Sequence, residues 1–258
     1  MPTNNENIGK TAKVSEPDIW QIFIGRGDAV KDEREFDRML YIIRKVTENK
    51  IFKSDLPAKE DFYVPTLTCR IIIYKGLLLP EQMEEFYPDL LDPEFESALA
   101  LVHQRYSTNT FPAWKLAQQF HVMCHNGEIN PVNGHDNWTN ARHASFPSHP
   151  FGENIEKLFP IIQPGLSDSA CLDQAVELLY HTGRSLPHVM MMLIPEAWQN
   201  HKTMSPEKKA FYEYHSTLIE PWDGPASIPF TDGSCIGAIL DRNGLRPSRY
   251  VVTKDGYV

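Results

Sequence analysis

Residues 120–130 read FHVMCHNGEIN, and this stretch decides how the middle of the chain is interpreted. The apolar-leaning FHVM indicates an extended segment, and Asn126-Gly127 after it is the strongest short-range signal for a hairpin turn. The same dipeptide offers a side-chain amide beside an unobstructed backbone N–H, which is the donor pair that an oxyanion hole needs. Taken alone, the dipeptide favours a plain turn, so the rest of the chain has to decide.

Helices are predicted before and after this stretch. Asp32 and Glu35 resemble a capping box, and apolar residues follow them at three- and four-residue steps, namely Phe36, Met39, Leu40, Ile43 and Val46. Ser205-Pro206 opens another predicted helix, which carries Phe211 and Tyr214, because proline is tolerated in a first turn.

A third helix is predicted over residues 169–182. Asp168 and Ser169 stand where N-caps belong, and Gly183 stands where a C-cap belongs. The helix begins inside the polar stretch SDSACLD, so its first turn is also a candidate binding site.

Strands are predicted in runs, with the helices grouped between them. The predicted extended segments are 65–76, 97–108 and 120–127, followed by a terminal hairpin of 234–241 and 248–256 joined by DRNGLRP. No βαβ alternation is visible, so the fold class is α+β. We expect residues 1–18 to be irregular, since they supply no packed face, and residues 19–258 to form a single domain.

Composition excludes several classes of protein. The formal net charge of −9 gives no overall attraction to nucleic acid or to an anionic membrane, and no apolar run approaches the ~20 residues that span a bilayer. The four cysteines are widely spaced and no HExxH is present, so neither a metal site nor a disulfide framework is predicted. These cysteines are Cys69, Cys124, Cys171 and Cys235.

Three stretches gather polar side chains at the ends of apolar segments: RYSTNTFP (105–112), HNGEIN (125–130) and SDSACLD (167–173). Arg105 offers a planar fork for a carboxylate, and Asp168 could accept from an ammonium group, so together they would hold an α-amino acid. Each has an ordinary alternative: a surface ion pair for Arg105, an N-cap for Asp168, and turns for Ser107 and Thr108.

Two further patterns favour packing over chemistry. Cys124 and His125 are adjacent on an extended segment and point to opposite faces, which disfavours a nucleophile pair and favours Cys124 as a small buried hydrophobe. VMMML (189–193) and the aromatic residues of WQNHK and FYEYH are predicted core rather than a cofactor site.

Several long motifs occur together in one order. They are LVHQRYSTNTFPAWKLAQQFHVMCHNGEIN, GLSDSACLDQAVELL, LIPEAWQN, KKAFYEYHSTLIEPWDGPAS and LDRNGLRPSRY. With them the chain resembles the type-2 glutamine amidotransferase domain of the glutamate synthase large subunit, from about the VSEPD segment to Val258. The resemblance implies an N-terminal-nucleophile hydrolase fold, a four-layer αββα sandwich of antiparallel sheets, here without its first strands.

The resemblance also implies a function and site residues. It implies hydrolysis of glutamine to supply ammonia for glutamate formation from 2-oxoglutarate. Asn126 and Gly127 match the oxyanion hole, and His125 stands beside them among the substrate-binding residues. Arg105 matches the residue that grips the substrate carboxylate and Asp168 the one that grips its amino group, while Arg246 in DRNGLRP has a supporting role.

The family's nucleophile is a cysteine at the mature N-terminus, activated by its own α-amino group. No CGxGF-type opening occurs in this sequence, so we expect a fragment that is inactive alone. The implied FMN, [3Fe-4S] cluster and synthase domain lie outside this region, and a small NAD(P)H-oxidising subunit is a further implied partner. A cytoplasmic location is expected, or a plastid if the protein is from a plant. A non-catalytic domain that binds glutamine or another subunit, and another type-2 amidotransferase, stay open as alternatives.

Overall fold

The computed structural model describes residues 1–106, 111–117, 120–129, 134, 137, 139, 141 and 149–258. Its helices are α1 (Lys10–Val14), α2 (Glu33–Phe52), α3 (Met83–Phe86), α5 (Asp168–His181), α6 (Leu186–Leu193) and α7 (Pro206–Ser216). Short 3-10 turns are η1 (Pro80–Gln82), η2 (Pro88–Leu91) and η4 (Gly152–Leu158). The strands are β1 (Asn126–Gly127), β2 (Ala226–Thr231) and β3 (Ile236–Leu240).

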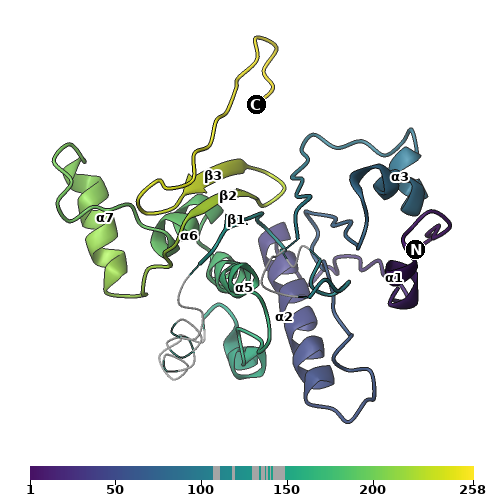
Figure 1. Ribbon diagram of the computed structural model, residues 1–258. Helices are drawn as coiled ribbons and strands as arrows, with labels where there is room; N and C mark the ends of the chain where they lie inside the picture. Colours follow the sequence, from purple (N-terminus) through teal and green to yellow (C-terminus); the bar gives the residue numbers. More distant parts are fainter. Residues whose placement is uncertain are drawn as a thin grey trace.

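One antiparallel sheet, in the order β1-β2-β3, forms within the described residues. Helices α5 and α6 lie against one face of it, and α2 lies beside α5 (Figure 1). The main core fills the space between these elements and includes Leu172, Val176, Met190, Leu193, Ile228 and Phe230. The expected α+β class is therefore confirmed at the level of helices with a small antiparallel sheet.

The predicted helices are confirmed because their ends are determined by local contacts. The Asp32 carboxylate accepts from the Glu35 backbone N–H at 2.8 Å, and Ser205 accepts from the Lys208 N–H at 3.3 Å. Gly183 follows α5 with a φ of 100°, as a C-terminal glycine should. The N-cap of α5 differs from the prediction, because Ser167 accepts from the Ala170 N–H and leaves the Asp168 carboxylate for other partners.

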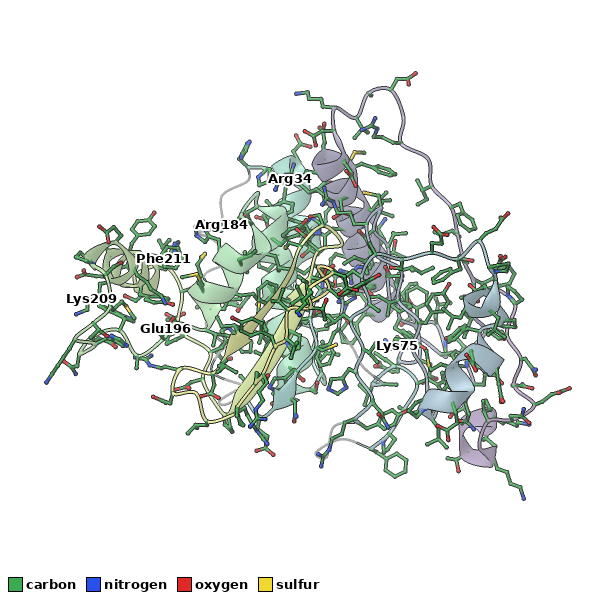
Figure 2. The ribbon with its side chains drawn as sticks, turned by 90° about the horizontal axis from the view of Figure 1, so that it is seen from above. Arg34, Lys75, Arg184, Glu196, Lys209 and Phe211 are labelled. Atoms are coloured by element: carbon green, nitrogen blue, oxygen red, sulfur yellow. The ribbon has the colours of Figure 1, made fainter. Side chains whose placement is uncertain are left out.

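The predicted core residues of α6 are confirmed, with Val189 and Met190 fully buried. Helix α7 lies at one end of the molecule, with Lys209 and Phe211 labelled on it, and Lys75 lies beyond the sheet (Figure 2). Phe211 packs between α7 and α6, its ring centroid 5.0 Å from that of His188. Tyr214, in contrast, is largely exposed.

Three predicted extended segments form no strand where the structure describes them. In 65–76 the backbone groups bond to side chains: the Cys69 N–H donates to Asp37 at 3.1 Å, and the Lys75 carbonyl accepts from the Tyr87 hydroxyl at 2.7 Å. The described part of 97–108 and the segment 248–256 also lack a ladder, and the latter runs out from the sheet (Figure 1). A strand requires a neighbour as well as a propensity, and the partner of β3 is β2.

The N-terminal segment differs in part from its prediction. Residues 1–18 include helix α1. Ile8 before the helix and Ala12 within it are buried in one cluster with Trp114, whose indole N–H donates to the Ala12 carbonyl at 2.9 Å. The rest of 1–18 has no regular structure, and the domain boundary at residue 18 stays a prediction.

Helix α2 buries charged residues beside part of the predicted apolar face, of which Leu40 is buried and Val46 packs against the core. Met39 and Ile43 are 43% and 46% exposed, whereas Arg44 and Lys45 are buried. Arg44 forms an ion pair with Glu177 of α5, which explains why the polar face turns inward.

Candidate active site

The segment 122–128 is extended and pairs with β2 on one edge. Val122 O accepts from the Thr231 N–H at 2.8 Å, Cys124 N–H donates to Pro229 O at 2.8 Å, and Glu128 N–H donates to Pro225 O at 3.0 Å. These even-numbered residues direct their backbone groups toward β2, so His125 and Gly127 direct theirs to the opposite edge. His103 confirms the direction, because its Nε2 lies 2.7 Å from the His125 carbonyl oxygen. The Gly127 N–H therefore points away from the ladder.

Among the described glycines, Gly127 is the one where an added Cβ would lie nearest to another atom. A Cβ on Gly127 would lie 1.8 Å from the Pro225 carbonyl oxygen, and the φ of +156° is one that L side chains rarely adopt. Gly224 repeats the arrangement, because its Cβ would lie 2.0 Å from the Glu128 carbonyl oxygen. The register Gly127↔Ala226 thus requires glycine for close contact, in addition to any turn.

Helix α5 holds the same segment at both ends. The Asp168 carboxylate accepts from the Ile129 N–H at 2.7 Å. Five residues further along α5, the Asp173 carboxylate accepts from the His121 N–H at 2.9 Å and the Val122 N–H at 3.2 Å. The HNG residues lie between these two anchors.

The predicted site residues gather around this segment to different degrees. Asp168 and Arg246 both act electrostatically on the His125 ring, and the Arg246 backbone N–H donates to Asp241 at 3.0 Å. Arg105 is exposed, and its backbone N–H donates to His103 Nδ1 at 3.2 Å. His103 in turn contacts the His125 carbonyl oxygen, so Arg105 is linked to the HNG residues through His103. Ser107 and Thr108 lie outside the described residues.

His125 is buried, and its Nε2 has no hydrogen-bond partner among the described residues. Burial lowers the pKa of this imidazole to about 4, against the opposing effect of the Asp168 carboxylate. The ring is therefore neutral near pH 7. A buried nitrogen without a partner costs about 1–3 kcal/mol, which a bound ligand would recover.

The low pKa of His125 predicts a loss of stability in weak acid. The unfolded imidazole has a pKa of about 6.5, so on acidification the unfolded chain takes up a proton before the folded one does. With a folded pKa of about 4, His125 should lower the free energy of unfolding by about 2 kcal/mol at pH 5 and leave it unchanged above pH 7. Urea unfolding at pH 7.5 and 5.0 measures the difference.

His125→Gln is the test variant, and His201→Gln is its matched control. His201 is exposed, so its replacement should leave the pH dependence unchanged, whereas His125→Gln should reduce it. Equal pH dependence in both variants would contradict a special contribution from His125.

None of the four thiols is placed as a nucleophile. Burial, with the Asp173 carboxylate, raises the pKa of Cys124 to about 12, so this residue is the small buried hydrophobe that was predicted. Cys69 is exposed, but partial desolvation and the Asp37 and Glu33 carboxylates raise its pKa to about 11. Desolvation also raises the pKa of Cys235, and Cys171 is buried within α5. A thiol attacks as its thiolate, so the raised pKa values of Cys69, Cys124 and Cys235 disfavour attack by these thiols near neutral pH.

In the described part of the chain no three His, Cys, Asp or Glu side chains gather in a way that could hold a metal ion. The helices described there also include none that is long and apolar enough to cross a membrane.

Sequence reasoning missed three residues that shape the site. Asp173 was inside the quoted stretch SDSACLD but had no individual role, and Gly224 sits in the quoted motif EPWDGPAS. The Asp241 carboxylate accepts from the Ala226 N–H at 3.0 Å and from the Leu245 N–H at 2.9 Å, tying DRNGLRP to β2. An aspartate ahead of an Asn-Gly pair is a usual turn signal, and it could have identified Asp241.

The HNG segment thus lies at the edge of the described antiparallel sheet and is anchored by two carboxylates of helix α5. This chain belongs to the class-II glutamine amidotransferase family, whose model matches residues 1–258. Proteins similar to this chain include glutamate synthases whose names specify NADPH, NADH or ferredoxin.

The glutamate synthase (NADPH) large chain of Bacillus subtilis (strain 168) is 52% identical over 258 residues, which are 100% of this chain and 17% of that protein. Glutamate synthase (NADH) of Schizosaccharomyces pombe is 46% identical over 261 residues, or 99% of this chain and 12% of that protein. The ferredoxin-dependent glutamate synthase of Pyropia yezoensis is 44% identical over 260 residues, or 100% and 17%. The chain thus spans about a sixth of the length of the first of these relatives.

Proposed function

We propose that this chain is the glutamine-hydrolysing part of a glutamate synthase and supplies ammonia for the formation of glutamate from 2-oxoglutarate. Family membership and the named relatives support the class of reaction. The observation that carries the proposal at the level of the site is the Gly127 N–H, which the ladder directs away from β2, next to an exposed Asn126 side chain. Two such donors can stabilise the oxyanion that forms when an amide carbon is attacked.

The remaining roles follow from charge and position. In this proposal Arg105 binds the substrate carboxylate and the Asp168 carboxylate binds its amino group. One Asp168 oxygen accepts from the Ile129 N–H at 2.7 Å and the other accepts from the Ser169 hydroxyl at 3.4 Å, and the second oxygen is the one to which an ammonium group would donate in this proposal. Neutral His125 contributes a buried nitrogen to the same place, and Arg246 supports the site through its charge.

The attacking thiol is proposed to come from another part of the protein, because the four thiols of this chain are unsuited to the step. After attack, the oxyanion collapses, ammonia leaves, and water hydrolyses the resulting thioester to glutamate. The proposal includes the four-layer sandwich of the N-terminal-nucleophile hydrolases for the complete domain. It also includes a cytoplasmic or, in a plant, plastid location.

The redox cofactors belong to other regions in this proposal. Cys124 and Cys171 are buried on different elements and the described residues hold no cluster of ligands, so the residues present do not fit an iron–sulfur cluster. FMN and the [3Fe-4S] cluster are therefore assigned to the synthase part of the whole protein, and a small NAD(P)H-oxidising subunit is its proposed partner. No step is derived through either group.

A chimera tests the proposal. The matching 258 residues of the Bacillus subtilis large chain are replaced by this chain, and release of ammonia from glutamine is measured. We expect the chimera to hydrolyse glutamine and the isolated chain to release no ammonia. In the chimera, Asn126→Ala should lower kcat about 10²–10³-fold, since one oxyanion donor is lost.

Asn200→Ala is the matched control, because Asn200 is also exposed and lies far along the chain from the HNG residues. Arg105→Leu and Asp168→Asn should mainly raise KM for glutamine.

Calorimetric binding of glutamine by an inactive chimera would favour the non-catalytic alternative, and activity with an acceptor other than 2-oxoglutarate would favour another type-2 amidotransferase. Ammonia release by the isolated chain would contradict the assignment of the thiol to another part of the protein.

A further inference from the structure

The pairing of segment 122–128 with β2 is weaker than its length implies. Two of its hydrogen-bonded positions face prolines, since Cys124 bonds to Pro229 and Glu128 bonds to Pro225. A proline has no N–H, so each of these pairs lacks its return bond. A one-residue slip of register would turn every side chain of the segment to the other face. The ladder therefore holds the HNG residues with fewer hydrogen bonds than a complete antiparallel pairing would supply.

Asp173 supplies what the ladder lacks. Its carboxylate is 0% exposed and accepts from two consecutive backbone N–H groups, those of His121 and Val122. The same carboxylate lies 2.7 Å from His121 Nδ1. Three hydrogen bonds to one buried carboxylate make a strong anchor, because each is charge-assisted.

Arg44 determines which ring nitrogen of His121 carries the proton. A guanidinium N–H only donates, so His121 Nε2, which lies 2.9 Å from Arg44 Nη1, must accept. The imidazole proton therefore resides on Nδ1 and is donated to Asp173. Glu177, which pairs with Arg44, completes a chain of contacts from α2 and α5 to the start of the HNG segment.

We propose that Asp173 is a positioning residue for the oxyanion donors. It fixes the register of the segment at its N-terminal end, Asp168 fixes the C-terminal end, and Asn126 and Gly127 are held between them. Arg44 orients Asp173 through His121. This inference rests on the proposed function for its catalytic consequence, but its structural part does not depend on activity.

Asp173→Asn tests the inference, with Asp232→Asn as the matched control. Asp232 is also buried and accepts from two backbone N–H groups, those of Ser234 and Cys235, both at 2.9 Å, but at the turn between β2 and β3. In the chimera, Asp173→Asn should lower kcat about 10- to 100-fold with KM for glutamine changed less than about twofold, since displaced donors lose their geometry. Asp232→Asn should leave kcat unchanged.

Amide hydrogen exchange of the isolated 258-residue chain is the readout that needs no activity. Asp173→Asn should speed exchange of the amides from Val122 to Gly127, and Asp232→Asn should not. Equal exchange in the two variants, or an unchanged kcat for a folded Asp173→Asn chimera, would overturn the positioning role. If the parent chimera is inactive, the proposed function fails, and the exchange data still decide whether Asp173 anchors the segment.

Discussion

Gly127→Ala is expected to lower the free energy of unfolding by about 2–5 kcal/mol, because strain at a positive φ and overpacking act together. The new methyl group would lie 1.8 Å from the Pro225 carbonyl oxygen and 2.9 Å from the Ala226 Cα. Both atoms belong to the backbone, so no side chain can rotate away. The strand pair must separate, and in the chimera glutamine hydrolysis should fall to the background rate.

Gly152→Ala is the control for Gly127→Ala. Gly152 has a φ of +59° and its added Cβ would meet nothing within 4 Å, so it carries the cost of a left-handed backbone without a clash. Its expected cost is about 1–2 kcal/mol. Urea unfolding of both variants measures the difference. Equal losses would mean that the close approach to Pro225 contributes nothing.

The contrast between helices and strands shows what the sequence could predict. Helix α5 begins after Ser167 and ends before Gly183 because of contacts within a few residues, so its limits were readable from the sequence. The segment 65–76 has the composition of a strand, yet its Cys69 N–H goes to the Asp37 side chain of α2. A strand depends on a pairing partner far along the chain, and the composition of the segment does not predict which residues that partner will be.

Strand β2, the central strand of the described sheet, was not among the predicted strands. Pro229 lies in the middle of the central strand, where a missing N–H disfavours strand assignment. It is tolerated because its carbonyl oxygen still accepts from Cys124, while Asp173 anchors the paired segment from the other side. The HNG motif and Asp168 could be predicted as site residues from the sequence because they are local signals within long motifs. Asp173 and Arg44 could not, because a buried carboxylate and a buried guanidinium look like surface residues until their partners are known.

Arg44→Met is expected to lower the free energy of unfolding by about 3–5 kcal/mol, because it leaves Glu177 as an unpaired charge in the core. Arg44 has a side-chain exposure of 1% and Glu177 of 9%. Burial raises the pKa of Glu177, but the charge and hydrogen bond of Arg44, together with His121 and His181, outweigh burial and hold that pKa at about 2. Arg34→Met on the same helix is the control, since Arg34 is exposed and its loss should cost within about 0.5 kcal/mol.

The cost of Arg44→Met should also depend on pH and on Glu177. In the wild type, a lowered carboxyl pKa stabilises the fold above the unfolded value of about 4.3, and this contribution is lost as the pH falls toward 2. Without Arg44 the pKa of Glu177 should rise, so its carboxyl group protonates in the folded state and the difference from wild type should shrink between pH 7 and pH 5. The double variant Arg44→Met with Glu177→Leu should recover more than half of the lost stability, because no buried charge is then left unpaired. Losses that simply add, with no dependence on pH, would show that Arg44 stabilises the fold through packing of its side chain rather than through its charge.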